Sequence, residues 1–359
     1  MRFAACLAGL VFALFARYTV ADESCRIAFD MGSSGIRAGA AGSDLTTRAE
    51  IDFLSPLWAG RGLEEVVAPT IAALNELPAK AGFPADCARV GGGFSAWRLA
   101  SEKDAASLVN ILRRIRSEAG VAVLVMPQLR EGAYGYFGAR KLLGERLTTS
   151  HILDVGGGSL QVAGERSAFG EALGQKIWQR YLCQEIRNAE TSPCGFQPLT
   201  RDEVAAARGL LQKKLGGMQQ ALPEQVTMTA ISRPVSRGVL PAVRRLSGSG
   251  VENQFTRADL AAAIDRIADL SIQETAVLVG SPASYVAYLL SDMLLVEGLM
   301  QATNSDLMQV AEIDLTNLPG LLADDKAFEW AGRYDCYLTR LRTSGAAAYG
   351  SDLTTCPAP

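Results

Sequence analysis

Histidine is almost missing from this chain: His151 is the only one among its 359 residues. The sequence also lacks a Cys-x-x-Cys pair and any cysteine–histidine spacing that is typical of zinc sites. These absences exclude a zinc centre of that kind and a catalytic triad that uses a second imidazole. Because His151 stands alone at the start of a hydrophobic stretch, we expect it to be structural.

A charge excess of either sign is missing too. The formal net charge is −3 at pH 7, and the 35 lysines and arginines are scattered along the chain. This distribution excludes a broad surface for a nucleic-acid duplex or an anionic membrane, so we expect a small partner molecule. The sequence has no low-complexity segment, and its 48% hydrophobic content is enough for a large core divided between two domains.

An apolar segment begins the chain. Arg2 precedes the apolar residues 3–16, and Thr19-Val20-Ala21 supplies small residues near a cleavage position. This order predicts a secretory signal peptide over residues 1–21 and a periplasmic or secreted mature protein that does not contact the membrane. The alternative is an uncleaved anchor, but the apolar run is shorter than the ~20 residues that a spanning helix needs.

Six cysteines remain when the signal segment and its Cys6 are set aside. An even number in an exported chain predicts three disulfide bonds, although counting alone leaves all fifteen pairings open. The six are Cys25, Cys87, Cys183, Cys194, Cys336 and Cys356.

Two segments share one pattern, which is an apolar strand, an aspartate, a glycine- and serine-rich turn, and a second apolar strand. The first contains Asp30-Met-Gly-Ser-Ser-Gly-Ile-Arg37 and the second contains Asp154-Val-Gly-Gly-Gly-Ser159. Their aspartates lie 124 positions apart, which indicates two duplicated α/β domains that each open with a β-hairpin. We expect these domains at residues 22–145 and 146–303, with residues 304–359 as a tail packed back on the body.

Strands and helices alternate around these motifs. Residues 105–118 predict an amphipathic helix and residues 121–126 a buried strand. The second half is more helical, since capping patterns at Thr200 and Thr256 open helices and residues 284–303 predict a long buried helix. Residues 244–253, rich in serine and glycine, predict a loop. The alternation favours mostly parallel sheets covered by helices.

The two glycine-rich turns indicate phosphate binding. Successive backbone N–H groups and hydroxyls in such a turn bind phosphate oxygens, and glycine allows the close approach of the backbone. Asp30 and Asp154, at the ends of their strands, suit a hydrated Mg²⁺ or Ca²⁺ that neutralises the phosphates. One such turn is also common as an ordinary hairpin, whereas two at a domain-sized separation indicate a clamp.

These motifs resemble the phosphate motifs of the actin, heat-shock-protein and sugar-kinase superfamily. Within it they are most similar to the exopolyphosphatase / guanosine pentaphosphate phosphohydrolase (Ppx/GppA) family, and stretches at residues 93–100, 130–138 and 292–300 extend the resemblance from about residue 25 to 303. The resemblance implies two actin-like (ribonuclease-H-like) domains around a central cleft, and hydrolysis of phosphoanhydrides.

The resemblance also implies a role for single residues. Glu131 would activate the attacking water, and Gln161 would join Asp30 and Asp154 on the metal side. The implied phosphate ligands are Gly32, Ser33, Ser34, Arg37, Arg98, Gly156, Gly157, Gly158 and Ser159. Each charged residue has a structural alternative: Glu131 as a solvated helix-start carboxylate beside Arg130, Arg98 as an ion pair or cap, and Arg37 as a strand arginine facing water.

Some residues resemble the ecto-nucleoside triphosphate diphosphohydrolases, or apyrases, instead. Gln161 stands where Ppx/GppA proteins usually have an acidic residue, Leu160 stands where both families have threonine, and residues 231–238 replace a third glycine- and threonine-rich motif. Three functions stay open: an exported exopolyphosphatase-like hydrolase, an apyrase-like hydrolase of nucleoside tri- and diphosphates, and a non-catalytic phosphate- or nucleotide-binding relative. A homodimer is an open assembly state.

The superfold also narrows the disulfide pairing. Cys25 and Cys87 precede two strands that are parallel neighbours in this superfold, so the two strand entries lie side by side and a bond between them is feasible. Cys183 and Cys194 flank a short polar loop that their bond would close. Cys336 and Cys356 are left to pin the tail.

Overall fold

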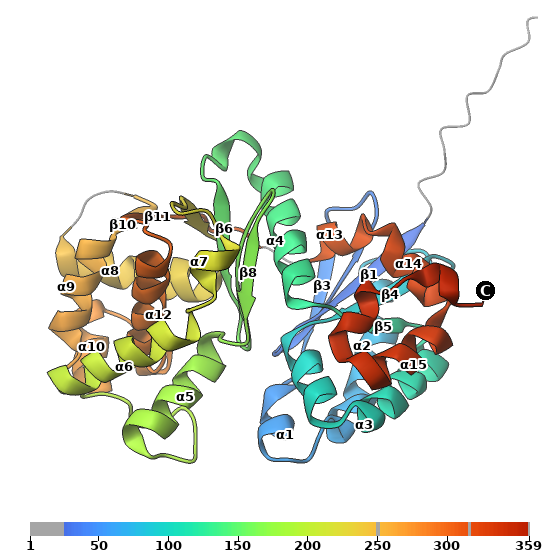
Figure 1. Cartoon of the computed structure of the whole chain (residues 1–359), viewed down its shortest axis with the longest axis horizontal. Coiled ribbons are helices and arrows are strands. Elements are labelled where there is room, and N and C mark those ends of the chain that lie inside the picture. Colours follow the sequence, from blue (N-terminus) through green and yellow to red (C-terminus); the bar gives the residue numbers. More distant parts are fainter. Residues whose placement is uncertain (1–24, 249–251, 315–316, 358–359) are drawn as a thin grey trace, which may run out of the picture.

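The computed structural model describes residues 25–248, 252–314 and 317–357. The expected signal peptide and part of the expected loop at 244–253 lie outside these residues. The chain folds into two α/β halves, each built on one sheet, and helix α4 (Gln128–Leu143) lies between them (Figure 1).

The first sheet has the strand order β3-β2-β1-β4-β5. Its strands are β1 (Arg26–Met31), β2 (Gly35–Ala40), β3 (Thr46–Glu50), β4 (Ala88–Gly93) and β5 (Ala122–Val125). Strands β1, β2 and β3 are antiparallel neighbours, whereas β4 runs parallel to both β1 and β5. The expectation of a mostly parallel sheet is therefore wrong, because the short turns after β1 and β2 return the chain at once as hairpins.

The second sheet has the order β10-β11-β9-β6-β7-β8. Its strands are β6 (His151–Val155), β7 (Leu160–Gly164), β8 (Ala168–Glu171), β9 (Met228–Ala230), β10 (Gln254–Thr256) and β11 (Leu307–Val310). The β6–β7 hairpin with its parallel neighbour β9 repeats the arrangement of β1, β2 and β4. This repeat in space confirms the two-domain actin-like architecture that the paired motifs predict.

Helices α1 (Leu54–Trp58), α2 (Glu64–Lys80) and α3 (Ser95–Ala119) accompany the first sheet. Helix α3 starts directly after β4 and is longer than the sequence pattern predicts. It bends at Asp104, whose φ of −156° is not helical and whose carboxylate accepts a hydrogen bond from Ser107 N at 2.9 Å. The amphipathic pattern marks only the part beyond this bend, since residues 95–101 are buried or half-buried and show no exposed polar stripe.

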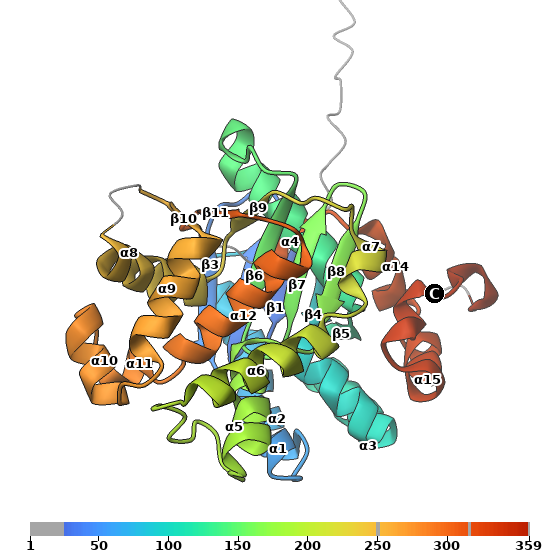
Figure 2. The same ribbon diagram turned by 60° about the vertical axis from the view of Figure 1, so that its left-hand side comes forward.

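Helices cover the side of the second sheet that faces away from α4 (Figures 1 and 2). They are α5 (Gln175–Arg187), α6 (Arg201–Lys214), α7 (Met218–Ala221), α8 (Leu240–Ser247), α9 (Arg257–Ile267), α10 (Ile272–Val279), α11 (Ala283–Val286) and α12 (Leu289–Ala302). The predicted capping boxes at Thr200 and Thr256 are present. The single helix expected at 284–303 is divided into α11 and α12, a break that the evenly apolar sequence does not mark.

The expected loop at 244–253 is helical at its start. Helix α8 continues to Ser247 and ends at Gly248, whose φ of 69° lies in the left-handed region that favours glycine at a helix end. The serine- and glycine-rich composition therefore marks the position of the helix end only to within a few residues.

The C-terminal helices pack on the first half (Figure 1). They are α13 (Leu318–Leu322), α14 (Asp325–Gly332) and α15 (Tyr334–Ser344). The hydroxyl of Tyr334 donates to Val123 O at 3.0 Å and that of Tyr337 accepts from Val125 N at 2.7 Å. These tyrosines satisfy backbone groups of the edge strand β5, so the helices both extend the core and close the sheet edge.

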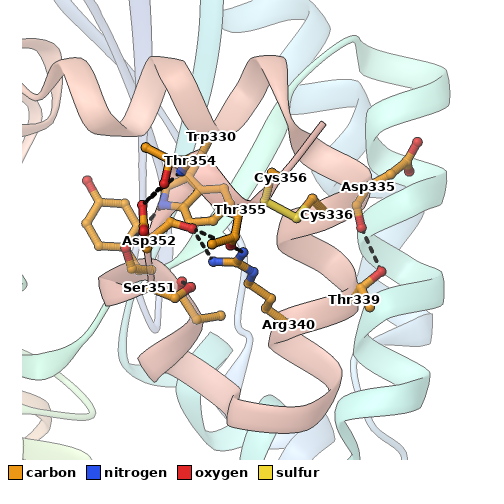
Figure 3. The surroundings of a disulfide bond; sticks show 12 residues. Trp330, Asp335, Cys336, Thr339, Arg340, Ser351, Asp352, Thr354, Thr355 and Cys356 are labelled. Atoms are coloured by element: carbon orange, nitrogen blue, oxygen red, sulfur yellow. Dashed lines mark hydrogen bonds between the residues drawn. A yellow bond between two sulfur atoms is a disulfide. The ribbon is translucent and has the colours of Figure 1, made fainter. Parts of the chain in front are cut away.

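Three disulfide bonds join the pairs expected from the superfold. Cys25 and Cys87 have Cα atoms 4.6 Å apart, and the Cα separation is 5.9 Å for Cys183–Cys194 and for Cys336–Cys356. Figure 3 shows the last bond, which holds the chain end against α15 beside Arg340. Within the part of the chain that the structure describes, no helix combines the length and apolar character needed to cross a membrane.

Candidate active site

The turns of the β1–β2 and β6–β7 hairpins face each other across a cavity of about 360 Å³. Helix α4 contributes Glu131 to its wall, and the segment before α13 contributes Asn317. The expected site residues that line the cavity are Asp30, Gly32, Ser33, Ser34, Arg37, Glu131, Asp154, Gly156, Gly157 and Ser159. A larger cavity of about 720 Å³ next to α13 contains none of these residues.

The two glycine-rich turns approach each other closely. A methyl group on Gly157 would lie 2.5 Å from Ser33 Oγ, so a side chain at this position would overlap the opposite turn. Each turn also closes on itself, since Gly32 N donates to Gly35 O at 3.1 Å and Gly156 N to Ser159 O at 2.8 Å. Small residues therefore bring both backbones to the same cavity, the arrangement that a phosphate clamp needs.

The N-terminus of α5 holds the second turn in place. Gln175 N donates to Gly156 O and Lys176 N donates to Gly157 O, each at 2.9 Å. Gly174 lies so close that a methyl group there would be 2.4 Å from both Gly156 O and Ser159 N. The shape of the second turn thus depends on the start of a helix that follows it in the sequence.

Glu131 lies in the first turn of α4 and is only 8% exposed. Its Oε2 accepts a hydrogen bond from Arg98 Nη2 at 2.6 Å, and Ser159 Oγ lies 3.4 Å from both carboxylate oxygens. The alternative of a solvated carboxylate beside Arg130 is therefore wrong. The ion pair fixes the orientation of Glu131 toward the cavity between the two turns.

The guanidinium group of Arg98 binds two groups inside the protein and does not reach the cavity. Besides the bond to Glu131, its Nη1 donates to Met126 O at 2.9 Å, and the side chain is buried. Arg98 is not among the residues that line the cavity. The structure thus gives it the ion pair that the sequence leaves open as an alternative to phosphate binding.

Asp30 and Asp154 are partly buried acids that line the cavity. Burial raises the pKa of Asp30 to about 6, although Asn317 N, 2.9 Å from Asp30 Oδ2, opposes this shift. Burial and the nearby negative charges of Glu131 and Asp30 raise the pKa of Asp154 to about 7. Carboxylates that lose water and repel one another in this way are stabilised by a cation.

The oxygen donors around Asp30 and Asp154 fit a hard divalent cation. Asp30 and Asp154 supply carboxylate oxygens, and Asn317 adds a buried Oδ1 without a hydrogen-bond partner. The three acidic side chains Asp30, Asp154 and Glu131 do not form a set whose carboxylate oxygens all lie within 4.8 Å of one another. Within the described residues, the one set of three possible ligands that meets this distance is Cys25, Asp86 and Cys87, and its sulfurs form a disulfide.

Two further expected residues lie behind the cavity wall. Gln161 faces Asp154 across the β6–β7 hairpin, but it is buried and its Nε2 donates to Ser159 Oγ at 3.1 Å. Gly158 packs against Ser95, where a methyl group would lie 2.8 Å from Ser95 Oγ. Neither lines the cavity, so both contact the clamp from outside.

Sequence reasoning missed several residues that line the cavity. Asn317 reaches Asp30 from 287 positions away, and nothing in its local sequence indicates this contact. Arg48 on β3 gives no motif signal either. Arg233 lies in residues 231–238, whose departure from the expected third motif was the available signal.

Comparisons with solved structures show the same fold. A Ppx/GppA enzyme of Aquifex aeolicus superposes with a TM-score of 0.62 at 16% identity, covering 84% of this chain and 99% of that chain. An exopolyphosphatase from Cytophaga hutchinsonii gives a TM-score of 0.58 at 14% identity, with 83% and 97% covered. An exopolyphosphatase-like protein gives 0.60 at 15% identity, with 84% and 98% covered.

A search of curated proteins found no match. The model of the Ppx/GppA phosphatase family, in contrast, matches residues 100–317, which is more than half of the chain. Enzymes of this family are typically dependent on divalent metal ions and act on phosphoanhydrides. The chain belongs to the Ppx/GppA phosphatase family and is a hydrolase of phosphoric anhydrides.

Proposed function

We propose that this protein is an exported enzyme that releases terminal phosphate from polyphosphate, using a water molecule activated by Glu131. The observation that carries the proposal is the place of Glu131, a buried carboxylate held by Arg98 in the wall of a cavity between two phosphate turns. A fixed carboxylate in such a place accepts a proton from water as the water attacks.

The hydrolysis of a phosphoanhydride depends on the alignment of water with the phosphate and on neutralisation of the phosphate charge. It needs no covalent intermediate with the protein. Backbone N–H groups and hydroxyls of the two turns bind the terminal phosphate, and Arg37 adds a forked positive donor at the cavity wall. Arg98 acts as a positioning residue that keeps Glu131 turned toward the attacking water. Gln161 supports the second turn indirectly, since its amide donates a hydrogen bond to Ser159.

Asp30 and Asp154 would hold Mg²⁺ or Ca²⁺ through its bound waters, and the ion would neutralise phosphate charge. Asn317 is a further oxygen donor beside Asp30. Gln161 is absent from this ligand set in the proposal, because its amide is already bonded to Ser159.

The cavity favours polyphosphate over a nucleotide. Among the described residues that line it, Phe94 is the one aromatic, and its ring is buried rather than exposed to the cavity. A base would therefore find no ring there on which to stack. An apyrase-like action on nucleoside tri- and diphosphates remains the second candidate, on the residues around Gln161 that resemble apyrases.

The proposal also includes export of the protein and its division into two domains and a tail. Three disulfide bonds suit an oxidising compartment such as the periplasm or the cell exterior. We place the domain boundary between residues 145 and 146, after α4, and assign residues 304–359 to a tail that supports the body. A homodimer is compatible with this organisation.

The test is phosphate release by the purified mature protein from polyphosphate, pyrophosphate, ATP and ADP, with Mg²⁺ and Ca²⁺ compared. We expect metal-dependent release of phosphate that is fastest from polyphosphate. Faster release from ATP and ADP would establish the apyrase-like function instead. No release from any substrate would identify a binding protein. Glu145→Gln, an exposed position just beyond α4, is the matched control for substitutions of Glu131.

A further inference from the structure

A buried carboxylate of the C-terminal tail binds the helix that carries Glu131. Tyr134 lies three residues after Glu131 on α4, and its hydroxyl donates a hydrogen bond to Asp324 Oδ2 at 2.6 Å. Asp324 directly precedes α14, and its Oδ1 caps that helix by accepting a hydrogen bond from Lys326 N at 3.1 Å. One carboxylate therefore joins the first turns of α4 to the start of a tail helix.

A second tyrosine hydroxyl shares the same carboxylate oxygen. Tyr349 lies in the short 3₁₀ helix Gly345–Gly350 and donates to Asp324 Oδ2 at 2.5 Å. Burial raises the pKa of the Tyr134 and Tyr349 hydroxyls, so both stay protonated and act as donors. Trp330 Nε1 donates to Tyr349 O at 3.1 Å, which holds this tyrosine within the tail. The carboxylate is thus fixed from α4 and from the tail together.

Arg130 gives α4 another contact with this cluster. Arg130 directly precedes Glu131 and shares a helix face with Tyr134, since these two residues are four positions apart. Its Nη1 lies 3.9 Å from Asp324 Oδ2, and its guanidinium carbon lies 5.7 Å from the centre of the Tyr349 ring. Residues before and after Glu131 in one turn of α4 therefore both contact the tail.

The start of α4 is also closely packed at Tyr134. Gly320 of α13 lies so near that a methyl group there would be 2.6 Å from Tyr134 Cα. The Tyr134 ring meets the Phe94 ring edge-on, with ring centres 6.5 Å apart, and Phe94 directly precedes α3. Arg98, the ion-pair partner of Glu131, lies near the start of α3. Tyr134 therefore joins the start of α4 both to the tail and to the start of α3.

Asp324 restrains a helix turn, whereas other contacts of the tail restrain a strand. Tyr334 and Tyr337 of α15 bind backbone groups of β5. The side chain of Asp324 is only 11% exposed and binds Tyr134 of α4. A catalytic group must stay within about 0.5 Å of its working position, which requires neighbours that are locked by packing and hydrogen bonds. Tyr134 is locked in both of these ways.

We propose that Asp324 is a positioning residue for Glu131, and that it acts by fixing Tyr134 and Arg130 on the same turn of α4. Arg98 orients the carboxylate of Glu131, and Asp324 orients the helix turn from which that carboxylate extends. The inference rests on the proposed function. It makes the tail part of the catalytic unit, although residues after 317 lie beyond the match to the family model.

Steady-state kinetics of Asp324→Ala test this role. The value of kcat should fall about tenfold through displacement of Glu131, and KM should stay within about twofold, because the phosphate turns are unchanged. Asp324→Asn should retain more of kcat, since its amide oxygen still accepts hydrogen bonds. In protein that already carries Glu131→Gln, Asp324→Ala should cause no further loss, because no base remains to be positioned. A further tenfold loss there would overturn the inference.

Hydrogen exchange gives a readout that does not depend on turnover. Asp324→Ala should speed amide exchange in residues 128–134, because the start of α4 loses its contact with the tail. If Asp324→Ala does not fold, Tyr349→Phe removes only one of the two hydroxyl donors and should show the same pattern on a smaller scale.

Tyr334→Phe is the matched control, because it removes another buried tyrosine hydroxyl of the tail, one that binds β5. It should leave kcat and the exchange of residues 128–134 unchanged. The inference fails if Asp324→Ala and Tyr349→Phe alter neither quantity, or if Tyr334→Phe lowers kcat as much as they do. If exchange rises but the wild-type protein releases no phosphate from any substrate, the tail still positions α4 and the hydrolytic proposal fails.

Discussion

Arg98 and Glu131 form an ion pair that is almost fully buried. Such pairs contribute little net stability, because removing two charges from water offsets most of their attraction. The value of this pair lies in orientation, since Arg98 is fixed in turn by Met126 O. Glu131 has few other donors, so the loss of Arg98 would leave it free to turn away.

Arg98→Ala should therefore lower kcat by about 10²-fold with a small change in KM, since a misplacement of about 1 Å at a reacting group has this effect. Arg98→Lys should recover part of kcat, because it restores the charge without the second bond. Steady-state kinetics measure this split. Arg140→Ala, on the exposed side of α4, is the control. An unchanged kcat in Arg98→Ala would remove its positioning role.

Asp154 makes stability depend on pH. Its pKa is about 7 in the folded protein and near 3.8 in the unfolded chain. Between pH 4 and pH 7 the folded state therefore holds a proton that the unfolded state has lost. Its contribution to stability is present below pH 4 and disappears as pH rises through 7. We expect Asp154→Asn to stabilise the metal-free protein at pH 8 by on the order of 2 kcal/mol, and to change little at pH 4.

Thermal or urea unfolding at both pH values, in the presence of a chelator, measures this effect. Asp269→Asn, an exposed substitution, should not alter the pH dependence. If Asp154→Asn retains the wild-type loss of stability between pH 4 and 8, then the burial of its charge is not the cause.

Among the elements, the glycine-rich turn between β6 and β7 depends on the start of α5. Gly174 has an ordinary extended φ of −75°, so the need for glycine comes from the close contact with the turn and not from backbone conformation. Gly174→Ala should push the turn outward. We expect a loss of roughly 1–3 kcal/mol of stability, as for other overpacked sites, together with a raised KM.

Gly209→Ala is the matched control, because a methyl group there has no neighbour within 4 Å and Gly209 lies inside helix α6. It should leave kinetics unchanged and stabilise the helix by about 0.5–1 kcal/mol. Wild-type stability and KM in Gly174→Ala would show that the turn does not rely on α5.

Short sequence patterns predicted the hairpins and the helix starts, because the residues that determine them are neighbours in the sequence. The hairpins around Asp30 and Asp154 carry their turn chemistry in adjacent residues, and the capping boxes at Thr200 and Thr256 mark two helix starts. The bend at Asp104 was missed because the hydrophobic period begins only after it. Likewise, the direction of each strand pair depends on turn length as well as on strand composition.

At the scale of the whole molecule, the site is assembled from both halves and the tail. The family resemblance predicted Glu131 and the two turns, because these residues lie in compact motifs. It did not predict that Arg98 is held by Glu131, or that Asn317 reaches Asp30 and Asp314 reaches Arg37 and Arg233. The contacts of Asn317 and Asp314 depend on the path of the chain from β11 to α13. This path cannot be predicted from a short stretch of sequence.

This assembly also fixes the position of Glu131 between the two halves. Helix α4 lies between the two halves (Figure 1) and contacts β6, β7 and β8 on one side and α13 on the other. Gly132 permits close packing on β7, where a methyl group would lie 3.2 Å from Ala163 Cβ. Helix α4, which contacts both halves, therefore places Glu131 in the wall of the cavity between the two glycine-rich turns.

A comparison of turnover and binding in Glu131→Gln tests the role of Glu131 most directly. If Glu131 activates the water, kcat for phosphate release should fall by about 10²- to 10⁴-fold, because general base catalysis contributes this much. Tripolyphosphate affinity, measured by calorimetry, should stay within about twofold of wild type, since the phosphate turns are unchanged. A kcat close to that of wild type and of Glu145→Gln would show that Glu131 does not activate the water.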